Sequence, residues 1–183
     1  MIILGIDPGS VLIGYGAISV ESKTLSLIEY GVVKAKLIEN EYNKRLGEIY
    51  NQITKLIDRV SPDIISLETM FYHKNAQSLI KLSQARAAVV ISAVNKNIDI
   101  VEYTPREVKK SVAGRGNSSK QQVQFMVRET LRIAETPEFY DCTDALALAI
   151  CHFYKQSSSI ANGSKVKSWA DYANQNPDKI INL

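Results

Sequence analysis

Two acidic residues of this 183-residue chain end apolar segments, where they could take part in metal chemistry. Ile2–Ile6 is an unbroken apolar run of the kind found in strands buried on both faces, and Asp7 follows it directly. Asp63–Glu68 is a second short strand-like segment, and it also ends on an acid. A carboxylate at the tip of a buried strand is costly unless a partner such as a metal ion compensates its charge. For Asp7 alone, an Asx-type bond to the neighbouring backbone is an equally good interpretation.

A second pair of acids, Asp141 and Asp144, is spaced three residues apart in the predicted helix Pro137–Tyr154, so the two share one face near its start. Taken singly, each is better explained as a helix cap or as compensation of the helix dipole. Together with Asp7 and Glu68 they favour a magnesium site, because magnesium prefers oxygen ligands and because gathered carboxylates repel one another without a compensating charge. Two such ions about 4 Å apart can activate a water and stabilise the leaving oxygen in phosphodiester hydrolysis.

The segment Tyr103–Arg132 has the composition expected of a phosphate-binding surface. It holds seven basic and two acidic residues, a net charge of +5, whereas the whole chain carries +3. Lys120 lies in the first turn of a helix predicted to open at Ser118–Gln121, where free amide groups and the helix dipole favour an anion. The alternative is an ordinary solvated helical face. Gly114–Lys120 lacks the G-K-[ST] ending of a Walker A loop, which excludes that motif.

The strands predict a sheet that could bring the two strand-tip acids together. Val11–Val20 and Leu25–Val33 follow the first strand with short connections, so these three strands should pair antiparallel. The helix predicted over Asn43–Val60 then precedes Asp63–Glu68, and a strand–helix–strand order returns the later strand parallel to a neighbour. If that neighbour is the first strand, Asp7 and Glu68 lie side by side. Asp99–Tyr103 is expected to be the last strand.

Glycines surround the expected position of Asp7. Pro8-Gly9 fits the middle of a type II turn, with Gly9 at positive φ. Gly14 and Gly16 interrupt the second strand near the same end, and a glycine within a strand often marks a bulge or a close approach by another group. We therefore expect the chain to reverse sharply after Asp7, and we expect Gly14 and Gly16 to mark either a bulge or a close approach by another group near this end of the sheet.

The helix predicted over Ala76–Asn95 is apolar on two sides. One apolar stripe comprises Leu79, Leu82, Val89 and Ala93, and a second comprises Ile80, Ala87, Ile91 and Val94. A helix of this kind is buried on two sides. Its second face meets either another subunit or another element of the same fold, and the pattern alone favours neither.

Composition indicates an ordinary globular protein. The chain is 45% hydrophobic and 22% charged, which suits one domain with a sizeable core. The two cysteines, Cys142 and Cys151, match no zinc or redox spacing and are expected to be reduced thiols. The first apolar run is too short for a signal peptide or a membrane span, so we expect a cytoplasmic protein with no membrane partner. We expect a folded domain over residues 1–155 and a polar, partly ordered tail over residues 156–183.

Four stretches of the sequence closely resemble the RuvC family of bacterial Holliday junction resolvases. In chain order they are GIDPGSVLIGYG, LETMFYHKNAQSLIKLSQARA, EYTPREVKKSVAGRGNSSKQQVQFMV and DCTDALALAI. The resemblance extends over about Met1–Lys155 and implies an α/β fold of the ribonuclease H-like class, a five-stranded mixed sheet flanked by helices. It also implies a homodimer packed largely through the helix over Ala76–Asn95.

The resemblance further implies a magnesium-dependent crossover junction endodeoxyribonuclease. Such an enzyme nicks two strands of like polarity symmetrically at a four-way (Holliday) DNA junction during homologous recombination and DNA repair. It leaves 5′-phosphate and 3′-hydroxyl ends that can be ligated. The family implies a branch-migration helicase complex as a partner, and two Mg²⁺ ions per active site, with Mn²⁺ able to substitute.

Site residues follow from the resemblance position by position. The matching catalytic and metal-ligating acids are Asp7, Glu68, Asp141 and Asp144. An aromatic that stacks on junction bases matches Phe71, and Tyr72 beside it could share that role or local core packing. The lysines that serve DNA binding and cleavage match Lys109 and Lys120, and a further basic residue in the matching loop is Arg115.

Two departures and two rival functions remain. Cys142 and Thr143 stand where the family commonly has alanines, and their side chains should point away from the acids, leaving the mechanism unchanged. The start G-I-D-P-G-S also resembles the phosphate motif of actin-like ATPases, which need two such domains and so a longer chain. The other rival is a non-catalytic junction-binding module, and the complete set of four acids argues against it.

Overall fold

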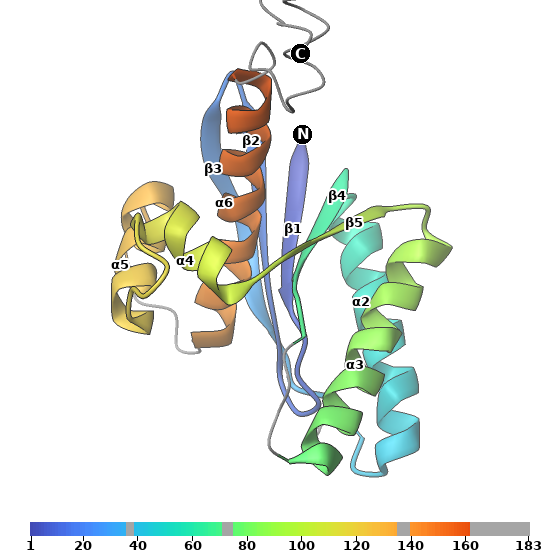
Figure 1. The fold of residues 1–183 in the computed structure, drawn as a ribbon. Coiled ribbons are helices and arrows are strands. Elements are labelled where there is room, and N and C mark those ends of the chain that lie inside the picture. The colour runs from blue at the N-terminus through green and yellow to red at the C-terminus, as the bar shows by residue number, and fades with distance from the viewer. Residues whose placement is uncertain (36–38, 71–74, 135–139, 162–183) are drawn as a thin grey trace, which may run out of the picture.

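The computed structural model describes residues 1–35, 39–70, 75–134 and 140–161, with side chains described as far as Ser157. A five-stranded sheet in the order β3-β2-β1-β4-β5 forms the centre (Figure 1). Its strands are β1 (Ile2–Asp7), β2 (Ile13–Glu21), β3 (Thr24–Val33), β4 (Ile64–Glu68) and β5 (Asp99–Tyr103). The helices around it are α2 (Tyr42–Val60), α3 (Ala76–Asn95), α4 (Pro105–Ala113), α5 (Lys120–Leu131) and α6 (Tyr140–Ala161).

Strand pairing confirms the predicted mixed sheet. β1, β2 and β3 pair antiparallel, and β4 lies parallel to both β1 and β5. The register of β1 with β4 ends at Ile6 opposite Leu67, one residue before each strand-tip acid. Asp7 and Glu68 therefore leave the sheet side by side at the same edge, as the strand–helix–strand order predicts.

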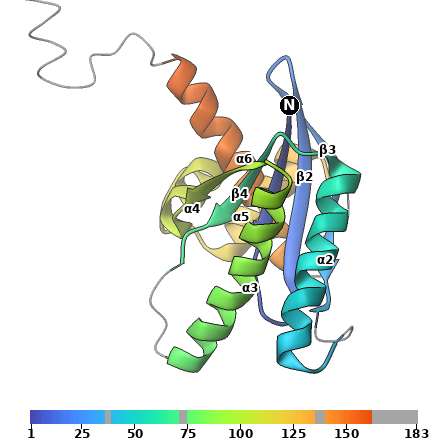
Figure 2. The ribbon, with the colours of Figure 1, turned by 90° about the vertical axis from the view of Figure 1, so that its right-hand side faces the viewer.

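Helices cover the two faces of the sheet unequally. α2 and α3 lie side by side on one face, and α4, α5 and α6 cover the other (Figures 1 and 2). In β1, Leu4 and Ile6 belong to the core under α2 and α3, whereas Ile3 belongs to the core under α4–α6. Since side chains alternate along a strand, Asp7 points to the α6 face. The same alternation in β4 places Glu68 on that face.

α6 lies directly against the backbone of β1 and β2. A Cβ atom on Gly5 would overlap the carbonyl oxygen of Ala145, and one on Gly14 would overlap that of Asp141. A Cβ on Gly16 would lie 2.5 Å from side-chain atoms of Leu146. The predicted close approach at Gly14 and Gly16 is thus confirmed, and the approaching element is the helix that carries the second pair of acids.

The prediction for Gly9 is wrong. Among the described glycines, only Gly114 has a left-handed backbone, with φ of 79°. Gly9 is needed for another reason: a Cβ there would overlap the carbonyl oxygen of Leu12, which folds back over it. The turn after Asp7 is tight because of this backbone contact, not because of a positive φ.

The second apolar stripe of α3 faces outward. Ile80, Ile91 and Val94 are 57%, 51% and 60% exposed, while Val89 and Ala93 of the first stripe are fully buried. The interpretation in which other elements of the same fold cover this stripe is therefore wrong for the part of the chain that the structure describes.

α6 extends past the predicted end at Tyr154, to Ala161. Its last turns contain three consecutive serines and lack the apolar periodicity that marks the rest of the helix. The predicted tail falls almost wholly beyond residue 161, outside the described residues, and its role stays a prediction. None of the described helices is long and apolar enough to cross a membrane.

Two glycine substitutions should have opposite effects on stability. Gly47 lies on the exposed side of α2, and a Cβ added there would have no atom within 4 Å, so Gly47→Ala should stabilise the fold by about 0.5–1 kcal/mol through the lower entropy of the unfolded chain. Gly5→Ala should destabilise it by about 2 kcal/mol or more, because α6 must move away from the sheet. Urea unfolding of both variants measures the difference, and equal midpoints for the two would contradict the proposed packing of α6.

Candidate active site

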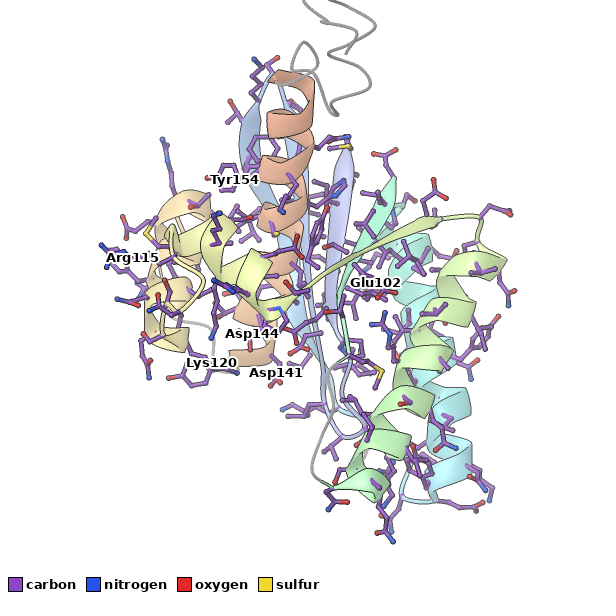
Figure 3. The ribbon with its side chains drawn as sticks, viewed as in Figure 1. Glu102, Arg115, Lys120, Asp141, Asp144 and Tyr154 are labelled. Carbon is purple, nitrogen blue, oxygen red and sulfur yellow. The ribbon has the colours of Figure 1, made fainter. Side chains whose placement is uncertain are left out.

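A cleft of about 240 Å³ opens where β1 and β4 end against α4, α5 and α6. Three of the four predicted acids, Asp7, Glu68 and Asp144, line it, together with Lys109 and Lys120. Its apolar wall is formed by Pro105, Val108, Val123, Ala147 and Leu148. Figure 3 shows Asp141 and Asp144 at the start of α6, with Lys120 of α5 pointing toward them. The structure thus brings residues from β1, near the N-terminus, and from α6, the last described helix, into one cleft.

Local structure explains why each acid points into this cleft. Asp7 and Glu68 lie on the α6 face of the sheet by strand alternation. β4 is anchored to α6 below them, because the Ser66 hydroxyl donates a hydrogen bond of 2.9 Å to the carbonyl oxygen of Leu148. Asp144 is held over the strand tips by the contact of α6 with Gly5 and Gly14.

Asp7 carries the strongest electrostatic signature in the cleft. Burial, and after it the negative charges of Asp144, Glu68 and Asp141, raise the pKa of Asp7 from 3.8 to about 7, while Lys120 opposes them. The predicted repulsion among four gathered carboxylates is therefore present. Asp141 does not line the cleft itself, but its charge acts on Asp7 from the preceding turn of α6.

Glu68 experiences the same conditions more weakly. Burial raises its pKa, and the charge of Asp144 adds to the effect. Lys120 and Lys109 lower it again. Both lysines therefore act on the carboxylates of the cleft, whereas the family resemblance placed only Lys120 near the active centre.

Lys120 makes the one direct ion pair in the described part of the cleft. Its Nζ lies 2.9 Å from Oδ2 of Asp144, and this hydrogen bond is the main reason that the pKa of Lys120 is raised. The residue opens α5, whose start is fixed by a reciprocal capping box between Ser119 and Gln122. Its side chain is 63% exposed, so the ammonium group can also reach a ligand that enters the cleft.

The cleft residues fit a hard divalent cation in their chemistry. They offer carboxylate oxygens, which Mg²⁺ prefers, and they hold more negative charge than their neighbours compensate. No group of three or more acidic, histidine or cysteine side chains among the described residues forms a ready-made metal-ligand cluster. The ligand atoms are therefore of the type that a metal ion prefers. In this structure, however, the carboxylates are too far apart to form a ligand cluster, and that of Asp144 is paired with Lys120.

Of the other predicted DNA-binding residues, the structure describes only Arg115, and it lies away from the cleft. Arg115 lines a separate surface hollow beside Phe125 and Met126, and Figure 3 shows it on the outer side of α5. Phe71 and Tyr72 lie outside the described residues, so their predicted stacking role is not tested.

Sequence reasoning missed two arginines that fix the backbone beside the acids. Arg45 of α2, only 8% exposed, donates to the carbonyl oxygens of Glu39, Asn40 and Ser10, the last at 3.5 Å in the turn after Asp7. Arg86 of α3 donates to the carbonyl oxygen of Glu68 at 2.7 Å. For Arg45 a signal existed, because it stands one helical turn before the buried Ile49 in the apolar stripe of α2. Arg86 gave no comparable signal.

Comparisons with known proteins agree with this geometry. The family model described as crossover junction endodeoxyribonuclease RuvC matches residues 3–152. A curated protein of that name from Porphyromonas gingivalis is 42% identical over 98% of this chain and 96% of its own length, and one from Chloroherpeton thalassium is 42% identical over 99% and 100%. The structure is similar to that of Thermus thermophilus RuvC in complex with Holliday junction substrate, with a TM-score of 0.79 and 30% identity over 87% of this chain and 97% of that one.

Replacing Asp7 should change how stability depends on pH. Because the folded-state pKa is about 7 and the usual value is 3.8, the folded protein binds more protons than the unfolded chain between these values, so stability falls as pH rises through this range. Asp7→Asn removes that loss and should stabilise the metal-free protein at pH 8, by up to about 4 kcal/mol at roughly 1.4 kcal/mol per pKa unit. Near pH 4 the two proteins should differ little.

The measurement is urea unfolding in EDTA at pH 4, 6 and 8. Asp99→Asn is the matched control, because Asp99 is exposed at the start of β5 and should leave the pH dependence unchanged. A pH-independent difference between wild type and Asp7→Asn would show that Asp7 is not the titrating group.

Proposed function

Because the chain belongs to the RuvC family of crossover junction endodeoxyribonucleases, we propose that it cleaves four-way DNA junctions by hydrolysing one phosphodiester bond in each of two strands. The observation that carries this proposal is the cleft in which Asp7, Glu68 and Asp144 meet two lysines at the end of the sheet. Its chemistry suits a phosphate: the carboxylates favour a divalent cation, and the lysines favour the phosphate charge.

Four residues form the proposed catalytic and metal-binding set: Asp7, Glu68, Asp141 and Asp144. They would hold two Mg²⁺ ions, or Mn²⁺ in their place, and these ions when bound activate a water and stabilise the leaving 3′ oxygen. To act as a ligand, Asp7 must give up its proton, and its raised pKa means that metal and proton compete near neutral pH. Binding of a cation to the cleft should therefore release protons.

The lysines have a separate proposed role in holding the scissile phosphate. Lys120 compensates Asp144 in the absence of DNA and is exposed enough to contact a phosphate oxygen while it stays beside the acids. Lys109 lines the same cleft from α4. Charge-assisted contacts of this kind position the backbone without reading sequence.

Contacts with the junction beyond the cleft are proposed for Phe71 and Tyr72, through base stacking, and for Arg115, through the phosphate backbone. Arg115 is supported by its place on the basic α4–α5 surface, in a hollow adjoining the first turns of α5. We further propose that the protein acts in the cytoplasm, in recombination and DNA repair, beside a branch-migration helicase complex.

A homodimer is proposed because the described residues of one chain form one cleft lined by three acids of the proposed set, whereas paired nicks need two such sites. The exposed apolar stripe of α3, which includes Ile80, Ile91 and Val94, supports this helix as the interface. Figure 2 shows α3 on the outer side of its layer, beside α2, where a second copy could pack against it.

Cleavage of a synthetic mobile four-way junction tests the proposed activity. With Mg²⁺, the protein should produce paired nicks in the junction and none in a matched linear duplex. Asp7→Asn should bind the junction but cleave it at least about 100-fold more slowly, since loss of a metal ligand exceeds the cost of losing an outer-shell partner. The control Asp99→Asn should cleave at the wild-type rate.

The outcomes distinguish the rival functions. Junction binding without cleavage by the wild-type protein, at any Mg²⁺ or Mn²⁺ concentration, would indicate a non-catalytic binding module.

Binding should also weaken steeply with added salt, because phosphate contacts release counterions.

Disruption of the α3 stripe tests the proposed dimer. Ile91→Glu places a charge on this apolar surface and should convert the protein to a monomer in light scattering coupled to size exclusion. Ile28→Glu is the control, because Ile28 is similarly exposed, at 43%, but lies on β3 away from α3. An unchanged mass for Ile91→Glu would place the dimer contact elsewhere.

A further inference from the structure

Arg86 bridges two neighbouring strands of the sheet from the middle of α3. Its Nη1 donates a hydrogen bond of 2.7 Å to the main-chain carbonyl oxygen of Glu68, at the tip of β4. Its Nη2 lies 2.6 Å from Oε1 of Glu102, on β5. The arginine side chain is only 12% exposed, whereas that of Glu102 is 47% exposed, so the contact with the Glu68 carbonyl is the better shielded of the two.

The peptide group that follows Glu68 is held at both of its polar atoms. The Thr69 N–H donates to the carbonyl oxygen of Tyr103 on β5, at 2.9 Å. The N–H and C=O of one trans peptide group point in opposite directions, so the Glu68 carbonyl points the other way, toward β1. If the parallel register is continued past the end of β1, the residue that would face this carbonyl is Pro8, which has no N–H to donate. Arg86 supplies the donor that the sheet itself cannot.

Arg86 approaches from the face opposite the cleft. Leu67 and Ile65 pack into the core under α2 and α3, so Glu68, the next residue along, directs its carboxylate to the α6 face. The charges that act on that carboxylate are those of Asp144, Lys120 and Lys109. Arg86 therefore contacts the backbone of Glu68 and leaves the carboxylate to the cleft.

Glu102 fixes the orientation of the guanidinium group. Glu102 stands opposite Leu67 in the register of β4 with β5, so its side chain shares the α3 face with Arg86. A planar guanidinium can satisfy a carboxylate and a carbonyl with two N–H groups held at a fixed angle. The single ammonium group of a lysine is a compact point charge without this fork.

We propose that Arg86 is a positioning residue for metal binding: by holding the Glu68 carbonyl from the α3 face, it fixes the direction in which the Glu68 carboxylate enters the cleft. This inference rests on the proposed function, which assigns Glu68 to the metal site. It also links the helix proposed as the dimer interface to the tip of β4, since the same helix presents its outer stripe to a second copy.

The test compares Arg86→Lys, Arg86→Met and Glu102→Gln with Arg59→Met. Arg59 is the control for loss of a helix–sheet charge pair: it pairs with a sheet acid, Glu29, at 2.7 Å, joins α2 to β3 away from the cleft, and is more exposed than Arg86, at 55%. Arg86→Lys keeps the charge and most of the volume, so it separates loss of the fork geometry from a failure to fold.

The first readout is backbone hydrogen exchange of the metal-free protein around Thr69. Both Arg86 variants should exchange these amides about tenfold faster than Arg59→Met, with unchanged far-ultraviolet circular dichroism. Equal exchange rates in Arg86→Met and Arg59→Met would overturn the bracing role, whatever the enzyme activity.

The second readout is the Mg²⁺ concentration that gives half-maximal junction cleavage. It should rise at least about fivefold in both Arg86 variants, and less in Glu102→Gln, while junction affinity in EDTA stays at the wild-type value. Wild-type Mg²⁺ dependence in the Arg86 variants would overturn the link to metal binding. Absence of cleavage by the wild-type protein would instead refute the proposed function, and the exchange experiment would still decide the role of Arg86.

Discussion

The contact of α6 with the bare backbone of β1 and β2 is the constraint on which the rest of the site depends. Three glycines, Gly5, Gly14 and Gly16, let the helix lie closer to the sheet than any side chain would allow. This distance sets where Asp141 and Asp144 stand above the tip of β1. Interiors are packed densely enough that a small change in helix position cannot be absorbed locally. The acids of α6 can therefore approach those of β1 and β4 because the sheet residues beneath the helix at this point are glycines.

The acids gathered in the cleft lower the stability of the fold. Asp7 is buried among three other acids, which raises its pKa to about 7, and Lys120 relieves only part of the repulsion. This cost is a large fraction of a typical folding free energy of about 5–15 kcal/mol, and the two cores on either side of the sheet must offset it. Local conflict between stability and chemistry is expected at functional sites.

Much of this arrangement could be predicted from the sequence, since it depends on local patterns. The apolar runs that end at Asp7 and Glu68 predicted the strand tips, and the strand–helix–strand order predicted their parallel neighbours. What failed depends on individual contacts with main-chain carbonyl groups, one local and one between distant elements. The turn at Gly9 is closed by the Leu12 carbonyl, and Arg86 reaches a carbonyl that Pro8 cannot serve. Neither contact leaves a periodic signal, and Phe71 and Tyr72 lie outside the described residues.

The alanine-rich face of α6 has a consequence for redesign of this enzyme. Ala145 and Ala149 are fully buried where the helix touches β1, and neither carries a group that could react. Gly5 lies against main-chain atoms of both residues, so the height of the helix above the sheet is set here, next to Asp144 and about one turn from Asp141. Efforts to improve thermal tolerance by filling the core with larger side chains should therefore spare these positions. The space left by the missing side chains therefore determines where the proposed catalytic acids stand.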